Sequence, residues 1–495
     1  MSIIQVSQNN CISNISYAEN NHLSLLEILS EHGFQLNSPC GGNGYCNKCI
    51  VTVNGKQTKS CTYIPNGDIC VTLPSSPDSD NTFSIADISS KNNTDSDPII
   101  HTADSTTYSV AIDLGSTSVS IAVVSTKIID ECTIKNPSSI YGSDIISRAQ
   151  SCVNGKKEIV AKLLVTSLEN EITRLMKKNK LDISNLNSIY IAANTAMQLM
   201  LLSLDCSEIL TYPFEINEYT HSFIYKNHPV YIIPSFSAFV GGDIVSGLYY
   251  LSPVQYKNYL FIDIGTNAEI VLSTHNKLYC TSAAAGPAFE GANISCGTAY
   301  VSGAINNASI IPTPNSDYKI TYKTIDNKLP CGICGTGILD IYSQMIKHGI
   351  IDKFKTLSEK YIDNGFKIAH SVNGNIIITQ NDIRQIQLAL SAIHTAIEIL
   401  LSKAELSANE IEKIYISGSF GSALTPETLA SINIFPFKIL NSDLISFSGN
   451  TSLLGAIKAA THKQSPEQFK NIINSCTEIT LANEPDFNDL FLKNM

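Results

Sequence analysis

The first periodic pattern of apolar positions lies close to the N-terminus. Three aliphatic side chains there repeat with helical spacing: Leu25, Ile28 and Leu29. Ser24 precedes them and forms, with Glu27, the S-x-x-E pattern of a capping box, and Gly33 can close the helix. We therefore expect a short helix over residues 23–33.

Two short runs rich in β-branched residues follow this helix. Residues 50–53 read Ile-Val-Thr-Val and end at Asn54-Gly55, a typical hairpin turn, and residues 71–74 predict a closing strand. Together with the helix, these runs predict a small half-open sheet over residues 1–74.

The pattern of apolar positions breaks off at residues 75–106. Ser, Asp, Asn and Thr dominate this stretch, which has few large apolar side chains to bury. Such a composition is typical of a flexible linker, so we expect a tether between residues 1–74 and the rest of the chain.

Beyond the linker, one pattern occurs twice, about 150 residues apart. In each copy an apolar run typical of a buried strand ends at an aspartate, a glycine turn with polar side chains follows, and a second strand begins. The copies read IDLGSTS from residue 112 and IDIGTNAEI from residue 262. This duplication predicts two related α/β lobes, residues 107–255 and residues 256–495. A regular apolar repeat over residues 383–402 predicts a long packing helix.

Composition narrows the classes of protein to which the chain can belong. Its 495 residues are 43% hydrophobic and 16% charged, enough for several domains with their own cores. The net charge is −11 and no run of Lys and Arg is present, which argues against nucleic-acid binding. The N-terminus lacks the features of a secretory signal, and no uninterrupted apolar stretch has the length of a membrane helix. We therefore expect a cytoplasmic protein without a membrane anchor.

Four of the 14 cysteines lie close together in and after the glycine-rich stretch CGGNGYCNKC, residues 40–49. They are Cys40, Cys46, Cys49 and Cys61. The glycines allow the loop to wrap an inorganic cluster with backbone N–H groups facing sulfur. The spacing is close to the plant-type pattern of [2Fe–2S] ferredoxins, with a first gap one residue longer. This pattern predicts a [2Fe–2S] cluster.

Two simpler interpretations compete with the cluster. A structural zinc site usually shows two C-x2-C pairs, whereas in this group only Cys46 and Cys49 have that spacing. Alternatively, the four thiols are unliganded core residues. The spacing and the glycines favour the cluster, and we expect Cys70 and most of the remaining cysteines to be core residues.

The duplicated turns have the chemistry of phosphate-binding elements. Their backbone N–H groups and hydroxyls can bind phosphate oxygens, and the aspartate at the strand end can hold Mg²⁺ through water. The candidate residues are Asp113, Gly115, Ser116 and Thr117 in the first copy and Asp263, Gly265, Thr266 and Asn267 in the second. A single turn of this kind is more often a plain strand end, but two opposed turns would clamp a triphosphate between two lobes.

Three further glycine-rich turns allow close approach of a ligand to the backbone: residues 286–291, 335–337 and 417–421. The last follows a strand pattern over residues 413–416 and precedes a predicted helix, which is a suitable place for an adenosine. Its candidate residues are Gly418, Ser419, Phe420 and Gly421. Each turn taken alone can equally be structural, and together they favour a nucleotide site.

A C-x-x-C motif, Cys331 and Cys334, precedes the turn at residues 335–337. It admits a redox dithiol or a second metal site, but buried thiols beside a turn are the favoured interpretation.

Taken together, these blocks resemble the ATP-dependent reductive activators of corrinoid proteins, which include the activating enzymes of O-demethylases. The resemblance spans most of the chain and rests on ordered blocks: CGGNGYCNKC at residue 40, IDLGSTS at 112, NPSSIYGSDIISR at 136, ANTAM at 193, PSFSAFVGGD at 234, FIDIGTNAEI at 261, AAAGPAFEGANISCG at 283, CGICGTGILD at 331, NDIRQIQLA at 381 and ISGSFGSAL at 416. It implies an α/β multidomain fold. A small β-grasp [2Fe–2S] ferredoxin domain and a flexible linker would precede a duplicated RNase H-like, two-lobed module of the actin, sugar kinase and Hsp70 superfamily.

The resemblance implies a repair reaction. In corrinoid-dependent methyl transfer, Co(I) is occasionally oxidised to Co(II), and such an activator returns one electron from its cluster with the help of ATP and Mg²⁺. The partners would be a corrinoid protein of a methyltransferase system and a low-potential electron donor. The four clustered cysteines would ligate the cluster, and the two aspartates of the turns would act in the nucleotide site. Asn194 and Asp243 lie in blocks typical of the family and are candidates for the cleft, although each can equally be a cap or turn residue.

Other functions remain open from the sequence. The chain could donate electrons to a different low-potential acceptor, as do the activators of acyl-CoA dehydratases and benzoyl-CoA reductases. It could also be a redox-responsive nucleotide-binding protein without turnover, or a sugar or acetate kinase, although a kinase leaves the cysteine loop unexplained. The sequence does not determine the corrinoid partner, the reductant, the ATP stoichiometry or whether the protein is a homodimer.

Overall fold

The computed structural model describes residues 2–8, 11–18, 23–32, 34, 36, 49–74 and 107–495, apart from gaps in the last range at 143, 218, 220, 253–254, 276, 292, 315–316, 373, 419–423 and 439–441. The described residues divide into two compact units. The first unit contains the chain up to Asp243 together with Ala456–Pro466, and the second contains Ile244–Gly455 and Glu467–Met495. The predicted linker, residues 75–106, lies outside the described residues.

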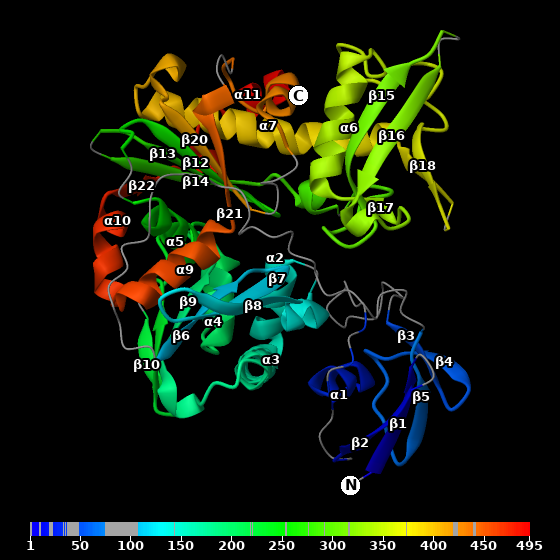
Figure 1. Cartoon of the computed structure of the whole chain (residues 1–495), viewed down its shortest axis with the longest axis vertical. Coiled ribbons are helices and arrows are strands. Elements are labelled where there is room, and N and C mark those ends of the chain that lie inside the picture. The colour runs from blue at the N-terminus through cyan, green and yellow to red at the C-terminus, as the bar shows by residue number, and fades with distance from the viewer. Residues whose placement is uncertain are drawn as a thin grey trace. The chain divides into compact units, whose positions relative to one another are not determined.

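The N-terminal part of the first unit is a five-stranded sheet with one helix packed on it (Figure 1). The strands follow the order β2-β1-β5-β3-β4, with β1 and β5 parallel and the other neighbours antiparallel. This is a β-grasp arrangement, as the resemblance implies. Its elements are β1 (Ser2–Gln8), β2 (Cys11–Tyr17), α1 (Leu25–Glu31), β3 (Ile50–Val53), β4 (Lys56–Lys59) and β5 (Ile69–Thr72).

The predicted helix and hairpin of this sheet are confirmed. The Ser24 hydroxyl accepts a hydrogen bond from the backbone N–H of Glu27, whose carboxylate accepts one from the N–H of Ser24 at 2.8 Å. The turn between β3 and β4 uses Asn54 and Gly55 in left-handed conformations, with φ of 46° and 80°. The prediction for Cys70 is wrong, because successive residues of β5 point to opposite faces and Cys70 is on the exposed one.

The rest of the first unit is built on a six-stranded sheet of order β10-β11-β9-β6-β7-β8. β6, β7 and β8 form an antiparallel meander, and β9 pairs with β6 in parallel. Apolar side chains of α3 and α4 share one core with the central strands. The elements are β6 (Tyr108–Leu114), β7 (Ser118–Val124), β8 (Ile128–Lys135), α2 (Ile145–Ser151), α3 (Lys157–Lys178), β9 (Leu186–Ala193), α4 (Thr195–Leu201), β10 (Ser222–Tyr225) and β11 (His228–Ile232).

The second unit repeats this plan. β12, β13 and β14 form an antiparallel meander, β20 pairs with β12 in parallel, and the sheet order is β21-β20-β12-β13-β14-β22. The repeated topology confirms the duplication predicted from the two aspartate turns. The strands are β12 (Tyr259–Ile264), β13 (Ala268–Ser273), β14 (Leu278–Ala283), β20 (Lys413–Ser417), β21 (Ile445–Gly449) and β22 (Cys476–Glu478).

Helices cover the second sheet, and a smaller α/β region is inserted after β14. Its three-stranded sheet has the order β16-β15-β17 and packs against α6 (Figure 1). The inserted elements are β15 (Ala304–Pro312), β16 (Tyr318–Thr324), β17 (Gly332–Ile333), α6 (Gly335–Lys347), β18 (Phe366–Ser371) and β19 (Gly374–Ile378). The remaining helices are α7 (Gln380–Lys403), α8 (Pro426–Ser431), α10 (Lys470–Asn474) and α11 (Phe487–Asn494). The boundaries between the two units fall within α5 (Gly242–Leu251), within α9 (Thr451–His462) and within the 3-10 helix Pro466–Phe469.

The long helix predicted over residues 383–402 is α7. It contributes apolar side chains to the same core as β12, β13 and β14. Among the described helices, it is the one with the length and composition to cross a membrane, but 78% of its most apolar window is buried inside the fold. These features are those of a core helix, as expected from its apolar repeat.

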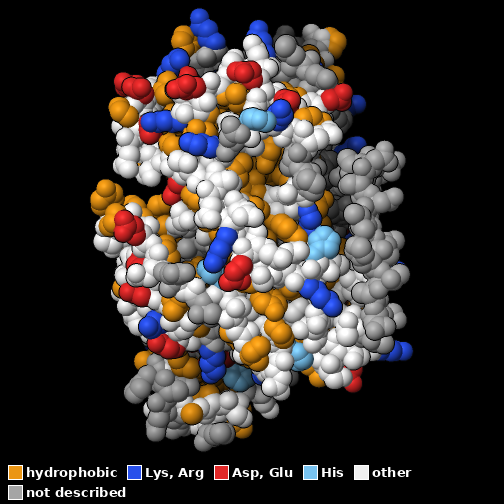
Figure 2. Space-filling model, turned by 90° about the vertical axis from the view of Figure 1, so that its left-hand side faces the viewer, with side chains coloured by type: hydrophobic (Ala, Val, Ile, Leu, Met, Phe, Trp, Pro, Cys, Tyr) orange, Lys and Arg blue, Asp and Glu red, His pale blue; other side chains and the backbone are white. Residues whose placement is uncertain are grey.

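Charged side chains are mixed on the surface. On the face shown in Figure 2, Lys and Arg are scattered among Asp and Glu and do not gather into a basic patch. This face therefore presents both signs of charge side by side.

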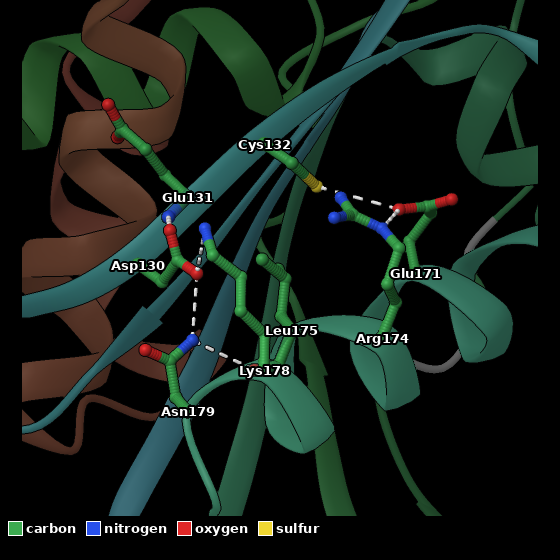
Figure 3. Close-up of polar contacts among 8 residues, drawn as sticks. All are labelled: Asp130, Glu131, Cys132, Glu171, Arg174, Leu175, Lys178 and Asn179. Atoms are coloured by element: carbon green, nitrogen blue, oxygen red, sulfur yellow. Dashed lines mark hydrogen bonds and ion pairs between the residues drawn. The ribbon is translucent and has the colours of Figure 1, made fainter.

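A polar cluster attaches α3 to the edge strand β8 of the first unit (Figure 3). Lys178 and Asn179 both donate to the carboxylate of Asp130, at 2.8 and 2.7 Å. Burial acts to raise the pKa of Asp130, but the hydrogen bonds from Lys178 and Asn179 outweigh it and hold the pKa below its usual value. Nearby, burial and the Glu171 carboxylate raise the pKa of Cys132 to about 11, so this thiol stays protonated at neutral pH.

We expect Asp130→Asn to lower the free energy of unfolding by about 1 kcal/mol, because it removes the charge that pairs with Lys178. The folded-state pKa lies below the usual value, so this contribution is present above about pH 4 and is lost as the pH falls through the folded-state pKa. Urea unfolding should therefore give the same loss at about pH 6 and about pH 8. Lys178→Met should add little to the Asn variant, whereas fully additive losses would contradict the pairing.

Candidate functional site

Two of the predicted cluster ligands lie in the described part of the β-grasp sheet. Cys49 comes directly before β3 and Cys61 shortly after β4, so this hairpin brings their Sγ atoms to 3.2 Å. The backbone N–H and the hydroxyl of Ser60 both donate to the carbonyl oxygen of Cys49, at 3.0 and 2.8 Å. Two thiolates this close can bind the same tetrahedral metal ion.

The other two predicted ligands, Cys40 and Cys46, lie outside the described residues. Among the residues that the structure does describe, no group of three or more His, Cys, Asp and Glu side chains could hold a metal ion. The Cys49–Cys61 pair fits one half of a two-iron cluster, in which each iron takes two protein thiolates. The complete cluster site stays a prediction.

The two aspartate turns occupy equivalent places in the two sheets. Asp113 lies near the carboxyl end of β6, and Asp263 lies near the carboxyl end of β12. In both turns the first two residues are half-buried and the third is exposed: Gly115, Ser116 and Thr117, and Gly265, Thr266 and Asn267. Within each unit, the fold therefore brings the predicted phosphate residues together at one edge of the sheet.

Buried side chains brace the first turn from behind. The Nδ2 atom of Asn136 donates to the carbonyl oxygen of Gly115 at 2.7 Å, and its backbone N–H donates to that of Thr117 at 2.9 Å. The Nη1 atom of Arg148 donates to the carbonyl oxygen of Ser116 at 2.5 Å. Asn136 is fully buried and Arg148 is 2% exposed, so water cannot easily replace these bonds.

This brace sets the direction of the turn's N–H groups. A trans peptide points its C=O and its N–H in opposite directions. Since the carbonyls of Gly115 and Ser116 face Asn136 and Arg148, the N–H groups of Ser116 and Thr117 point away from them. Successive backbone N–H groups with a common orientation can form an anion-binding element.

The second turn is held in a different way. The N–H of Gly265 donates to the carbonyl oxygen of Asn267 at 2.8 Å, so the turn uses this donor to close on itself. The hydroxyl of Thr266 donates to the carboxylate of Glu290 at 2.8 Å. The Thr266 hydroxyl and the Gly265 N–H therefore already donate hydrogen bonds within the protein.

Carboxylate oxygens gather beside the second turn. Asp263 lies directly opposite Glu269 of β13, so both side chains are on the same face of the sheet. Glu290 approaches the turn from the 3-10 helix at residues 287–290. Like charges directly opposite one another destabilise a strand pair, and a bound cation would relieve this repulsion. Mg²⁺ prefers hard oxygen ligands such as carboxylates. The residues present therefore fit Mg²⁺.

The predicted adenosine turn starts at the carboxyl end of β20. Gly418 has a left-handed φ of 101°, and a Cβ there would lie 2.7 Å from the carbonyl oxygen of Ile264 and 3.2 Å from Oδ1 of Asp263. Only glycine can therefore bring this turn so close to the second aspartate. The other candidates of this turn lie outside the described residues: Ser419, Phe420 and Gly421.

Asn194 and Asp243 both lie close to Gly241. Asn194 caps α4, and its Oδ1 accepts a hydrogen bond from the N–H of Met197 at 2.9 Å. A Cβ at Gly241 would lie 2.4 Å from Cα of Asn194 and 2.7 Å from Oδ1 of Asp243. Glycine at this position allows the start of α5 to approach the end of β9. The cap interpretation of Asn194 is confirmed.

The two cysteines of the C-x-x-C motif make separate contacts. Cys331 is exposed and its Sγ donates to the carbonyl oxygen of Ser302 at 3.7 Å, whereas Cys334 is buried and donates to that of Ile305 at 3.3 Å. Burial raises the pKa of the Cys334 thiol, which disfavours thiolate chemistry. The prediction of buried thiols is therefore confirmed for Cys334 and wrong for Cys331, which lies at the surface. The separate contacts favour structural roles over a redox dithiol.

Three residues that hold the turns were not candidates from the sequence. They are Asn136, Arg148 and Glu290, and their contacts span 21, 32 and 24 positions of the chain. All three lie in blocks that carry the family resemblance, which was the available signal. No local pattern of hydrophobic and polar positions predicts contacts at such separations.

Comparison with known proteins places both aspartate turns in one family. The model of the RACo middle region matches residues 108–252, and the model of the C-terminal domain of RACo, the ASKHA domain, matches residues 257–495. Together the two models cover most of the chain and both aspartate turns. ASKHA is the superfamily of actin, the sugar kinases and Hsp70, so the predicted nucleotide-binding fold is confirmed.

Individual relatives agree with this result. The corrinoid activation enzyme RamQ of Eubacterium limosum is 28% identical over 429 residues, which is 78% of this chain and 70% of the relative. The Co(II) methylated amine-specific corrinoid protein reductase of Methanosarcina barkeri is 28% identical over 262 residues, 48% of this chain and 46% of that protein. Among solved structures, the reductive activator for corrinoid,iron-sulfur protein has the same fold, with a TM-score of 0.69, 23% identity, and coverage of 99% of this chain and 97% of that one.

We expect Arg148→Gln to lower the free energy of unfolding by about 2–3 kcal/mol, because it removes charged, buried hydrogen bonds to the Ser116 and Gly142 carbonyls. Arg174→Gln is the matched control. Its side chain is 52% exposed and pairs with Glu171 three residues away, so its loss should be only about 0.5 kcal/mol. Chemical unfolding measures both losses, and equal values would contradict the proposed brace.

Gly418→Ala should destabilise the second unit by about 1 kcal/mol more than Gly349→Ala does. Both glycines have a left-handed φ, but a Cβ at Gly349 would have nothing within 4 Å, whereas one at Gly418 would meet the end of β12. Comparison of the unfolding free energies separates the contact from the shared backbone strain. The same loss in both variants would show that the turn can move away from Asp263 at no cost.

Proposed function

The chain belongs to the family that the two RACo models describe, and on this premise we propose that it is an ATP-dependent reductive activator of a corrinoid protein. One observation carries the proposal: the same chain contains a β-grasp sheet and an ASKHA fold, and the sheet holds the thiols of Cys49 and Cys61 next to each other. The thiol pair suits electron transfer and the aspartate turns suit a nucleotide. The relatives named as a corrinoid activation enzyme and a Co(II) corrinoid protein reductase support a corrinoid protein as the target.

The electron-transfer part of the proposal rests on four thiolates: Cys40, Cys46, Cys49 and Cys61. A [2Fe–2S] cluster held by them would supply one-electron chemistry, accepting an electron from a low-potential donor and passing it to Co(II) of a corrinoid protein, which becomes Co(I). The β3–β4 hairpin holds Cys49 next to Cys61, and Ser60 fixes the backbone at that point. These contacts orient two ligands before any metal binds.

The nucleotide part of the proposal explains how an uphill step can occur. A plant-type cluster has a potential of about −400 mV, and the family resemblance implies that the Co(II)/Co(I) couple lies lower. Nucleotide binding can make the transfer feasible if ATP binds more tightly to the complex in which the electron moves. In the first unit, the N–H groups of Ser116 and Thr117 would bind phosphate. In the second unit, Asp263 and Thr266 would hold Mg²⁺, directly or through water.

The test is an anaerobic mixture of the reduced full-length protein with a Co(II) corrinoid protein, followed by its visible spectrum with and without Mg-ATP. We expect Co(I) to form only when Mg-ATP is present. Cys61→Ser should lose both the cluster absorbance and Co(I) formation. Asp263→Asn should keep the cluster absorbance and lose about 10- to 100-fold in the rate of Co(I) formation, because it weakens the binding of Mg²⁺.

Cys70→Ser is the matched control for the cysteine variant, because Cys70 lies on the same sheet but is exposed and outside the spacing pattern. It should retain the cluster absorbance and the Co(I) yield. If the cluster is reduced normally and no corrinoid protein accepts the electron, another low-potential acceptor becomes the leading function. Binding of ATP without ATPase activity beside a Co(II) partner would instead indicate a regulatory nucleotide-binding protein.

A further inference from the structure

The hydrogen bond between Thr266 and Glu290 has a defined direction. The Oγ1 atom of Thr266 donates to Oε2 of Glu290 at 2.8 Å, and this bond uses the single hydroxyl proton of Thr266. Once this proton is used, the hydroxyl has only lone pairs to offer to a ligand. Phosphate oxygens are also acceptors, so Thr266 cannot donate to a phosphate in this arrangement.

The position of Glu290 is fixed by the segment that carries it. Phe289 is 1% exposed and lies in the core of the second unit, which anchors the short helix at residues 287–290. Gly291 closes this helix with a left-handed φ of 82°, and a Cβ there would lie 2.5 Å from the backbone nitrogen of Thr298. The carboxylate therefore extends from a tightly packed turn. Its Oε1 atom faces the turn as well, since a Cβ at Gly265 would lie 3.6 Å from it.

A carboxylate at this position is unfavourable for a bare phosphate and favourable for a phosphate that brings a cation. Asp263 and Glu269, which lie opposite each other on β12 and β13, add two more carboxylates on one face of the sheet. Mg²⁺ binds carboxylate, hydroxyl and water oxygens, and it enters nucleotide sites attached to the phosphates. A hydroxyl that is a donor to Glu290 and an acceptor toward the ligand has the polarity that Mg²⁺, or a water in its shell, requires.

We propose that Glu290 is a positioning residue that holds the Thr266 hydroxyl as an acceptor for the Mg²⁺ of the bound nucleotide. The second turn then discriminates between Mg-nucleotide and free nucleotide. This inference rests on the proposed function only in assuming that the chain binds a nucleotide.

The experiment compares the affinity of full-length Glu290→Gln for ADP in excess Mg²⁺ and in EDTA, using titration calorimetry. The glutamine amide can either accept from Thr266 or donate to it, so the polarity of the hydroxyl is no longer imposed. We expect the gain in affinity that Mg²⁺ gives to fall about tenfold. Affinity in EDTA should stay the same or rise, because a negative charge has been removed from the site.

Glu412→Gln is the matched control. Glu412 accepts hydrogen bonds from the N–H groups of Lys257 and Asn258 at the opposite end of β12, at 2.7 and 3.0 Å. The substitution removes one charge from the same unit but should leave the effect of Mg²⁺ on ADP affinity unchanged. An equal reduction in this control would attribute the result to net charge and overturn the inference.

Thr266→Val provides a second variant, which keeps the shape of the side chain and removes the hydroxyl. It should reduce the effect of Mg²⁺ as Glu290→Gln does, and the double variant should add little, because both changes remove one contact. If Thr266→Val leaves the effect of Mg²⁺ intact, or if Glu290→Gln weakens ADP equally with and without Mg²⁺, Glu290 only holds the loop and the inference is wrong.

Failure of this inference can be told apart from failure of the proposed function. A wild-type protein that binds ADP in the Mg²⁺-dependent manner described here, but forms no Co(I), supports the role of Glu290 and contradicts the reductive activation. A wild-type protein that binds no nucleotide overturns both.

Discussion

Each strand that ends in a turn aspartate has a parallel neighbour, and this pairing determines where the candidate phosphate residues lie. β9 pairs with β6, and β20 pairs with β12, in parallel in both cases. Parallel neighbours end at the same edge of a sheet, where α/β folds bind their ligands. Asp113 therefore has the cap of α4 beside it, and Asp263 has Gly418 beside it. An antiparallel neighbour would start at this edge, and the loops that follow β9 and β20 would lie at the other end of the sheet.

The two turns arise from one duplicated motif, but their surroundings give them different chemistry. In the first, Asn136 and Arg148 bind the carbonyl oxygens of Gly115 and Ser116, so the next N–H groups of the turn point away from these two side chains. In the second, the N–H of Gly265 closes the turn and the hydroxyl of Thr266 is bound to Glu290. The first turn thus directs backbone N–H groups away from its brace, whereas the second turn keeps only the lone pairs of its hydroxyl for a further partner.

In the β-grasp sheet, the spacing of the cysteines reflects the length of a hairpin. Residues 50–59 form β3, the Asn54-Gly55 turn and β4, and they account for most of the gap between Cys49 and Cys61. The antiparallel pairing returns the chain to its starting point, so thiols far apart in sequence come within 3.2 Å. The gap between Cys49 and Cys61 is thus the length that a short β-hairpin requires.

The sequence by itself determined the features that depend on local periodicity and turn chemistry. These are the capped helix α1, the β3–β4 hairpin, the long core helix α7 and the duplicated strand–turn–strand units with their aspartates. Each is set by residues within a few positions of one another. The family resemblance, also read from the sequence, correctly identified the ASKHA fold.

Only the tertiary structure decided which groups of the turns remain available to a ligand. The contacts of Asn136, Arg148 and Glu290 join segments more than 20 positions apart, and no local pattern reports the direction of a hydrogen bond across such a distance. The exposure of Cys70 was mispredicted for the same reason, since the buried face of β5 depends on the strands and the helix that pack on it. Secondary structure follows from short-range sterics and capping, whereas burial and the availability of donors depend on what the rest of the chain places nearby.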